Sequence, residues 1–315
     1  MRIAVTSRSF SQHPQLRVEL LNRYKNVTFN DWGLALSGDT LIDYLRGHDR
    51  AIIGLEVVDA MLLSRVPELK VISKMGVGID SIDLNALAKY QVALSSTPGA
   101  NKRSVSELVI AFAILMLRHI FVSHKNLLAG TFKQIKGNQL SEKVVGIIGF
   151  GAIGQDLCAL LQAFNCRVLV YDVACTEVFC KSHHAQLVSI EELLKNADIV
   201  TLHVPLNGST KNLLNAGRLR LMKKSAILIN TARGGLVDEA ALQVLLEAGD
   251  ICGAAFDVFS VEPPENKSLL NLPNFFSTPH IGGGTEEAIL AMGVAAIEGL
   301  DMAVIPRMSE TVVAQ

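Results

Sequence analysis

The sequence predicts an α/β fold built from two doubly wound parallel-sheet domains with a cleft between them. Short apolar runs typical of strands alternate with helix-like segments along nearly all of the 315 residues. Such alternation predicts parallel strands with helices on both faces. The alternation is interrupted once and then starts again, which predicts two similar lobes. Half of the residues are hydrophobic, enough for a sizeable core and for more than one domain.

The first lobe contains four strand-like runs that are short and rich in Val, Ile and Leu, as expected of buried parallel strands. They are "RIAVTS", "AIIGL", "LKVISKMG" and "VALSS". Three helix-like segments lie between them: "QLRVELLNRY", "DAMLLSRV" and "NALAKYQ".

A helical segment then crosses between the lobes. A Pro-Gly turn precedes it, and we expect one long helix from about Ser104 to Ala129. Its most apolar part, Leu108–Leu117, is shorter than the roughly 20 residues of a membrane span. We therefore interpret it as a buried helix, either inside the subunit or between subunits.

The second lobe repeats the alternation with seven strand-like runs. They are "VVGIIGF", "RVLVYD", "AQLVSI", "ADIVTLHVP", "AILINTA", "GAAFDVF" and "NFFSTPH". The chain then continues into a last helix, "TEEAILAMGVAAIEGLDMAV".

Three glycines follow the first of these runs in the pattern GxGxxG. Gly149 allows a tight turn, Gly151 lets the backbone approach a pyrophosphate, and Gly154 lets the next helix pack close to the strand. The start of that helix offers free N–H groups and a positive dipole end to phosphates. The alternative is a purely structural glycine turn.

Asp172 ends the next strand-like run, "RVLVYD". Its separation from the glycines is close to the roughly 20 residues expected for an acid that binds a ribose hydroxyl pair. A carboxylate there would repel a 2′-phosphate, and no arginine follows it directly. The pattern therefore predicts dinucleotide binding and favours NAD over NADP.

Composition argues against several other classes of protein. The net charge of −1 gives no electrostatic case for binding nucleic acid or an anionic membrane. The start "MRIAVTSRSF" lacks a signal-peptide apolar region, so we expect a cytoplasmic protein. The cysteines form neither a CxxC pair nor a zinc-spaced cluster, so we expect no metal and interpret them as small buried hydrophobes. They are Cys158, Cys166, Cys175, Cys180 and Cys252.

Three polar residues lie just after predicted strands, where α/β proteins place their ligands. Arg233 can hold a carboxylate in two hydrogen bonds, and His280 can exchange a proton near neutral pH. Glu262 can pair with that histidine and orient its ring. Together with NAD, this set suffices to reduce a 2-oxo acid. The alternatives are a surface loop for Arg233, a solvated turn acid for Glu262 and a loop histidine for His280.

Five motifs appear in order along the chain: "GIIGFGAIG", "HVPLNGSTKNLLN", "LINTARGGLVDEAAL", "AAFDVFSVEPP" and "TPHIGG". Together they resemble the D-isomer specific 2-hydroxyacid dehydrogenase family, which contains phosphoglycerate, glycerate and glyoxylate-type dehydrogenases. The resemblance covers nearly the whole chain. It implies a catalytic set of Arg233, Glu262 and His280, with His280 as the proton donor.

The resemblance also implies ligand contacts in both lobes. The loop "KMGVGIDSID" resembles the one whose backbone, here Val77 and Gly78, holds the substrate carboxylate. The predicted NAD contacts are Gly149, Gly151, Ala152, Ile153, Gly154, Asp172, His203, Val204, Pro205, Thr231, Ala232, Asp257, Gly282 and Gly283, with Thr97 and Val105 near the nicotinamide end.

The resemblance further implies the division of the chain. Residues 1–99 and 285–315 would form a discontinuous, flavodoxin-like substrate domain, and residues 100–284 an NAD-binding Rossmann domain. The cleft would close by hinge motion near Pro98-Gly99 and Gly282–Gly284. Members of the family are usually homodimers through the cofactor domain.

Several features of the sequence bear on the identity of the substrate. General similarity favours a phosphoglycerate dehydrogenase-like enzyme. Leu55 and Glu56, however, stand where many such enzymes carry an arginine for the substrate phosphate, and Lys74 is the remaining candidate cation. The alternatives are a glycerate/hydroxypyruvate or glyoxylate reductase, and a non-enzymatic NAD(H)-sensing protein similar to the co-repressors of this family.

Overall fold

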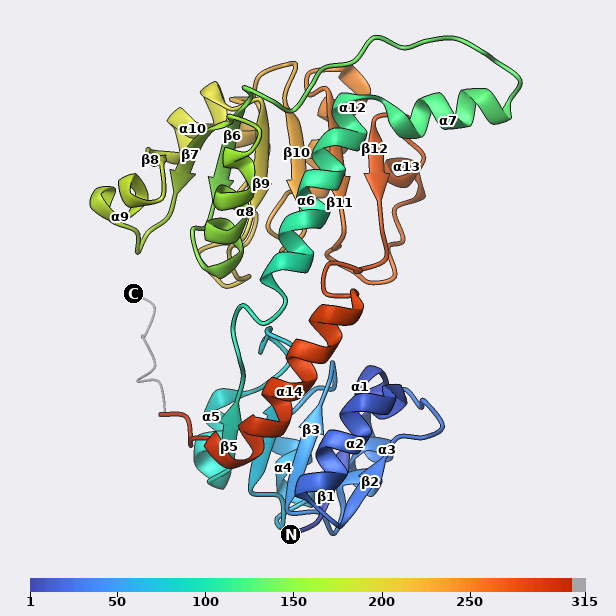
Figure 1. Cartoon of the computed structure of the whole chain (residues 1–315), viewed down its shortest axis with the longest axis vertical. Helices are drawn as coiled ribbons and strands as arrows, with labels where there is room; N and C mark the ends of the chain where they lie inside the picture. Colours follow the sequence, from blue (N-terminus) through green and yellow to red (C-terminus); the bar gives the residue numbers. More distant parts are fainter. Residues whose placement is uncertain (308–315) are drawn as a thin grey trace. The chain divides into compact units, whose positions relative to one another are not determined.

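The computed structural model describes residues 1–307, which form two compact units (Figure 1). Unit 1 contains Met1–Asn101 and the chain from Thr285 onward, and unit 2 is Lys102–Gly284. Each unit is built around a parallel sheet. The structure thus confirms the predicted α/β class with two parallel sheets.

The sheet of unit 1 has five strands in the order β2-β1-β3-β4-β5. The order reverses between β1 and β3, and ligands of open parallel sheets bind at such a switch point, beyond the carboxyl ends of the strands. The strands are β1 (Ile3–Val5), β2 (Val27–Phe29), β3 (Arg50–Ile53), β4 (Val71–Lys74) and β5 (Ala93–Ser95). The helices of this unit are α1 (Arg8–Gln12), α2 (Pro14–Arg23), α3 (Gly38–Leu45), α4 (Ala60–Arg65), α5 (Leu84–Tyr90) and α14 (Glu286–Met302).

Helices cover both faces of this sheet. One core cluster joins the strands to α3, α4 and α5, and a second joins them to α1, α2 and α14. The last helix therefore returns to the first lobe of the chain, where Ser73 Oγ donates a hydrogen bond to the Ala296 carbonyl at 2.7 Å.

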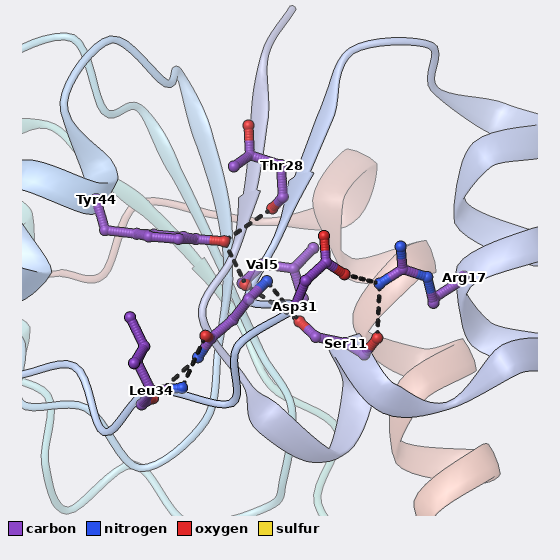
Figure 2. A network of polar contacts seen from close by, with 8 residues as sticks. Val5, Ser11, Arg17, Thr28, Asp31, Leu34 and Tyr44 are labelled. Carbon is purple, nitrogen blue, oxygen red and sulfur yellow. Dashed lines mark hydrogen bonds and ion pairs between the residues drawn. The ribbon is translucent and has the colours of Figure 1, made fainter.

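Polar contacts fix the loops that leave β1 and β2 (Figure 2). The Tyr44 hydroxyl donates to the Val5 carbonyl at 3.1 Å, and burial raises the pKa of this phenol, which keeps it a donor. Arg17 Nη1 donates both to the Ser11 carbonyl at 2.8 Å and to Asp31 Oδ1 at 2.5 Å. These contacts hold the first two loops at the carboxyl edge of the sheet.

The sheet of unit 2 has seven strands in the order β12-β11-β10-β9-β6-β7-β8, and its order reverses between β6 and β9. The strands are β6 (Val144–Ile148), β7 (Arg167–Tyr171), β8 (Ala185–Leu187), β9 (Ile199–Leu202), β10 (Ile227–Asn230), β11 (Gly253–Phe256) and β12 (Phe275–Ser277). The helices are α6 (Lys102–Leu117), α7 (Ile120–Leu128), α8 (Ala152–Gln162), α9 (Glu177–Ser182), α10 (Ile190–Asn196), α11 (Ala216–Leu219), α12 (Glu239–Ala248) and α13 (Lys267–Leu270).

This sheet is also covered on both faces. Helices α6 and α8 pack on one face, and α10, α11, α12 and α13 pack on the other. The strands are accordingly buried on both sides, with all four residues of β9, β10 and β11 inside the core.

The prediction of one helix from about Ser104 to Ala129 is wrong. The helix breaks after Leu117, and α6 and α7 meet at a bend of 59°. His119 adopts the left-handed conformation at φ 51°, which ends the helical ladder. The chain that returns after α7 explains the break. Asn138 N donates to the Leu117 carbonyl at 2.9 Å, in place of the N–H group that would bond to it in a continuous helix.

Within residues 1–307 no single helix combines the length and apolar character needed to cross a membrane, although the bent α6–α7 pair together meets that length and composition. Helix α7 has no buried residue and exposes Ile120, Leu127 and Leu128. The homodimer expected from the resemblance stays a prediction.

Replacing Gly299 by alanine tests the packing of α14. A Cβ atom there would lie 2.4 Å from Ser73 Oγ and 2.6 Å from Ser95 Oγ. We expect Gly299→Ala to lower the free energy of unfolding by about 1 to 2 kcal/mol, because overpacking outweighs the gain in helix propensity. Urea denaturation measures this change. The exposed neighbour variant Glu298→Ala should stay within about 0.5 kcal/mol of the wild type, and equal stability of the two variants would contradict this packing.

Candidate active site

The candidate site lies at the carboxyl edge of the unit 2 sheet. Strands β6, β9, β10 and β11 are neighbours in the sheet and run parallel, so the loops that follow them emerge at the same edge. The order reverses between β6 and β9, and ligands of open α/β sheets bind at that position. Most of the predicted site residues lie in these loops.

The glycine turn after β6 has the geometry that the sequence predicted. Gly149 has φ 98°, and a Cβ atom there would lie 2.6 Å from the His203 carbonyl oxygen. A Cβ atom on Gly154 would lie 2.4 Å from the Gly149 carbonyl oxygen, so α8 can approach the turn only with glycine there. Around Gly151 there is nothing within 4 Å of such a Cβ. This leaves open space beside the backbone at the second glycine.

Helix α8 begins beside this open space. Its N-cap is Gly151, which offers no side-chain cap. The first N–H groups of a helix have no partner inside the helix, and together with the helix dipole they attract an anion. Ala152 and Ile153 are the first two residues of α8 and are exposed and half-buried, respectively. Their amides are therefore suited to a phosphate group.

Asp172 closes the same turn from β7. Its Oδ2 accepts from Phe150 N at 2.7 Å, and its Oδ1 accepts from Ala174 N at 2.7 Å and Cys175 N at 3.1 Å. A carboxylate has about four acceptor positions, so acceptor capacity remains for a ligand hydroxyl. The structure thus gives Asp172 a second role, in shaping the turn, that the sequence did not predict.

Two buried polar atoms at this edge have no hydrogen-bond partner within residues 1–307: His203 Nδ1, just after β9, and Thr231 Oγ1, just after β10. The other ring nitrogen of His203, Nε2, shares a hydrogen bond of 3.0 Å with Thr201 Oγ1. Burial lowers the pKa of His203 to about 3, so its ring is neutral at physiological pH. A bound polar ligand at this edge would give both atoms a partner.

Asn230, the last residue of β10, shapes the turn that carries Arg233. Its Oδ1 accepts from Ala232 N at 3.1 Å, and its Nδ2 donates to the Arg233 carbonyl at 2.9 Å. Arg233 Nη1 donates to the Ala232 carbonyl at 2.7 Å. A Cβ atom on Gly234 would lie 1.9 Å from the Phe259 carbonyl oxygen, so the turn packs directly against the next loop. The role of Asn230 was not predicted, although a polar residue at the end of an apolar strand is a signal that the sequence contains.

His280 and Glu262 form a pair. His280 Nδ1 lies 2.9 Å from Glu262 Oε2, and Glu262 Oε1 accepts from Phe259 N at 3.0 Å. The side chains are 47% and 39% exposed, so the pair is open to a substrate from outside. Because the carboxylate can only accept from Nδ1–H, the other nitrogen, Nε2, is the one that can exchange a proton with a ligand.

The buried carboxylate of Asp257 organises the loop that carries His280. Its Oδ1 accepts from the Thr278 hydroxyl and from Ile281 N at 2.8 Å, and its Oδ2 accepts from Gly282 N at 2.7 Å. The Asp257 carbonyl also accepts from His280 N at 2.9 Å. This carboxylate, which the resemblance implied as a cofactor contact, is here bound to the protein's own loop.

The remaining predicted residues occupy varied positions. Val204 lies beside Gly149 and Val105 beside Gly282. Ala232 is buried, Gly283 half-buried and Pro205 exposed. Thr97, Val77, Gly78 and Lys74 belong to unit 1.

In unit 1, Lys74 and Glu56 both bind Gly54 in the loop after β3. Lys74 is only 5% exposed, and its Nζ donates to the Gly54 carbonyl. Glu56 Oε2 accepts from Gly54 N at 2.5 Å. The loop with Val77 and Gly78 follows the neighbouring strand β4, so the two loops share the carboxyl edge of this sheet.

Comparison with known proteins places these features in a family. Residues 110–282 match the model of the D-isomer specific 2-hydroxyacid dehydrogenase, NAD binding domain. The chain belongs to the D-isomer specific 2-hydroxyacid dehydrogenase family. Its unit 2 accordingly carries the NAD-binding domain of this family, as the sequence motifs predicted.

Several relatives bear different names. The chain is 36% identical to the D-3-phosphoglycerate dehydrogenase of Methanocaldococcus jannaschii over 88% of its own length, but spans only 54% of that protein. It is 37% identical to the hydroxypyruvate reductase of Thermotoga maritima, covering 76% of this chain and 79% of the relative. The crystal structure of D-lactate dehydrogenase from Aquifex aeolicus, complexed with NAD and lactic acid, superposes with a TM-score of 0.81 at 26% identity, over 96% and 94% of the two chains.

The residues present fit a dinucleotide. The open space at Gly151 and the start of α8 suit the pyrophosphate, and the remaining acceptor capacity of Asp172 suits a ribose hydroxyl. The unpartnered Nδ1 of His203 and Oγ1 of Thr231 lie at the ends of β9 and β10, on the other side of the switch point. Within the part of the chain that the structure describes, there is no group of three His, Cys, Asp or Glu side chains that could hold a metal.

The lowered pKa of His203 predicts a loss of stability in acid. The folded protein keeps the ring neutral down to about pH 3, whereas the unfolded chain takes up a proton below its ordinary value of 6.5. Between these values the unfolded state binds more protons. The free energy of unfolding therefore decreases as the pH is lowered, by up to about 1.4 kcal/mol per pH unit. We expect His203→Asn to lose stability less steeply from pH 6 to pH 4.

Urea denaturation at a series of pH values measures this slope. His184→Asn is the matched control, because His184 is exposed and has a positive φ of 57° that asparagine tolerates. This control should keep the slope of the wild type. The same slope in all three proteins would show that His203 does not cause the acid sensitivity.

Proposed function

We propose that this protein is an NAD-dependent D-2-hydroxyacid dehydrogenase that interconverts a small 2-hydroxy acid and its 2-oxo acid. The observation that carries the proposal is the 2.9 Å contact between His280 and Glu262, in the unit that matches the NAD-binding domain of the family. Arg233 lies in a neighbouring loop of the same edge and completes the set needed for an oxo acid.

His280 is the proposed general acid. Glu262 accepts from its Nδ1, fixes the tautomer and stabilises the charge of the protonated ring. Nε2 then donates its proton to the carbonyl oxygen of the oxo acid, and takes the hydroxyl proton in the opposite direction. When bound, the nicotinamide supplies or accepts the hydride at the adjacent carbon.

Arg233 is the proposed ligand of the substrate carboxylate. Its guanidinium is permanently charged and can bind a carboxylate through two parallel hydrogen bonds. Asn230 fixes the backbone on both sides of this residue, so the side chain begins from a defined position. Holding the acid in one orientation aligns its carbonyl with the proton donor.

Glu262→Gln tests the role of the carboxylate. The amide can still contact the ring but cannot stabilise its positive charge, so we expect kcat for oxo-acid reduction to fall about 10- to 100-fold with little change in KM. Loss of NADH absorbance measures the rate. The control is Glu265→Gln, an exposed acid three residues away, which should keep the wild-type rate. Full activity of Glu262→Gln would contradict the proposed pair.

We further propose that the physiological substrate is unphosphorylated, as in a hydroxypyruvate or glyoxylate reductase. Lys74 is buried and its ammonium donates to the Gly54 carbonyl, so it does not lie on an open surface where it could meet a substrate phosphate. A substrate phosphate near this loop would meet the carboxylate of Glu56, and like charges at close range are strongly unfavourable. A phosphoglycerate dehydrogenase is the second candidate, favoured by the relatives of that name and by the exposed Arg8 at the start of α1.

The deciding assay compares hydroxypyruvate and glyoxylate with 3-phosphohydroxypyruvate as oxidants of NADH. We expect kcat/KM to be at least about tenfold higher for one of the unphosphorylated acids, and Glu56→Gln to reduce that preference by about tenfold. Glu298→Gln, on the exposed side of α14, should leave the preference unchanged.

Preference for the phosphorylated acid would overturn the substrate proposal and point to Arg8 or Lys74 as the phosphate ligand. Binding of NADH without turnover of any 2-oxo acid would overturn the enzymatic proposal, and would favour an NAD(H)-sensing binding protein instead.

A further inference from the structure

Two cysteines lie together beside the Asp172 turn. The Sγ atoms of Cys175 and Cys180 are 2.6 Å apart, and both residues are free thiols. Cys175 is half-buried in the loop after β7, and Cys180 is fully buried on α9. A disulfide has a sulfur separation of about 2.05 Å, so the two sulfurs are within about half an ångström of bonding distance.

We propose that Cys175 and Cys180 are a reversible redox pair that forms an intramolecular disulfide under peroxide and so locks the Asp172 turn. This modification site follows β7, whereas Arg233, Glu262 and His280 follow β10, β11 and β12, on the other side of the switch point in the sheet. It does not depend on which 2-oxo acid the protein reduces.

The chemistry balances with hydrogen peroxide as the oxidant. The Cys175 thiolate attacks one peroxide oxygen and is oxidised to the sulfenic acid, while the other oxygen leaves as water after taking up a proton. The Cys180 sulfur then attacks the Cys175 sulfur and forms the S–S bond. The sulfenic hydroxyl leaves with the Cys180 proton as a second water. A dithiol reductant restores both thiols by thiol–disulfide exchange and is itself oxidised to a disulfide.

The surroundings of the two sulfurs give them different roles. Burial raises the pKa of Cys180 to about 12, so this thiol stays protonated at neutral pH. A third cysteine, Cys158, also stays protonated, because burial raises its pKa to about 11. Cys175 is the more accessible member of the pair, so the peroxide reaches it first. Cys180 is held against it by α9, whose N-cap Thr176 accepts from Phe179 N at 3.3 Å.

The pair is connected to the cofactor turn through two routes. The backbone N–H of Cys175 donates to Asp172 Oδ1 at 3.1 Å. On α9, the ring of Phe179 lies edge-on to that of Phe150, with centroids 6.2 Å apart, and Phe150 N donates to Asp172 Oδ2 at 2.7 Å. The structure contains these contacts to Asp172 while the two sulfurs are 2.6 Å apart.

Oxidation should therefore fix the turn in its described conformation. Preorganising a binding loop lowers the entropy lost on binding, and we expect the dissociation constant of NADH to fall about two- to fivefold in the oxidised protein. A disulfide that displaced Asp172 would instead weaken NADH binding.

To test the proposal, the protein is treated with hydrogen peroxide, and its disulfides are mapped by mass spectrometry of the intact protein and its peptides. The expected result is a loss of two hydrogens, a Cys175–Cys180 crosslink, and recovery of both thiols with dithiothreitol. Cys175→Ser and Cys180→Ser should each abolish the crosslink. Cys252→Ser, which changes an exposed cysteine outside the pair, should keep it.

NADH binding is then measured by nicotinamide fluorescence in the reduced and oxidised forms. A lower dissociation constant after oxidation, restored by dithiothreitol, supports the lock. Absence of the crosslink in the wild-type protein, pairing of either cysteine with Cys158 or Cys166, or unchanged or weaker NADH binding after oxidation would overturn it. Because the crosslink is detected without catalysis, failure of this proposal is distinguishable from failure of the proposed reaction.

Discussion

Parallel pairing of strands is the constraint on which the site depends. In unit 2, β6, β9, β10 and β11 pair in one continuous parallel register, so every connecting loop that follows a strand emerges at the same edge. The strand order reverses between β6 and β9, and the helices that follow these strands, α8 and α11, cover opposite faces of the sheet. The turn at Gly149 then lies beside the loop at His203. Residues far apart in the chain thereby reach one region without any long insertion.

Polar side chains then fix the loops at that edge, and those of Asp257 and Asn230 are buried. Asp257 receives three hydrogen bonds from the segment that carries His280, and Asn230 bridges the backbone around Arg233. Glu262 contributes one oxygen to the loop and the other to the imidazole. A buried carboxylate or amide is costly unless it is fully hydrogen-bonded. The hydrogen bonds of Asp257 and Asn230 offset the cost of burying these two side chains, and they hold the loops that carry His280 and Arg233 in place.

Hydrogen bonds of Asp172 link the turn suited to the cofactor to the two neighbouring cysteines. Asp172 is at once the acceptor suited to a ribose and the anchor of the amides of Phe150 and Cys175. Through those amides the turn is joined to the aromatic contact with α9 and to the neighbouring thiols. A change in the sulfur atoms can therefore reach the carboxylate through two short chains of contacts.

The sequence by itself determined the alternation of strands and helices, the glycine turn and the family. These are local properties: the period of apolar residues sets the element type, close backbone contacts require glycine at positions 149 and 154, and Gly151 leaves open space beside the backbone. The break of the helix after Leu117 was not predictable, because it depends on a hydrogen bond from Asn138, which reaches Leu117 only after the chain has turned back.

Only the tertiary structure decided the roles of Lys74, Asp257 and the Cys175–Cys180 pair. Lys74 resembles a free cation in the sequence but is buried with its Nζ on the Gly54 carbonyl. The partners of Asp257 lie in the 278–282 loop, which the fold brings beside the end of β11. The two cysteines are five positions apart in a segment without a recognisable motif, and the start of α9 brings their sulfurs together. The roles of Lys74 and Asp257 depend on contacts between distant segments, and that of the cysteine pair depends on the local course of the chain into α9, so residue types and spacing alone do not reveal them.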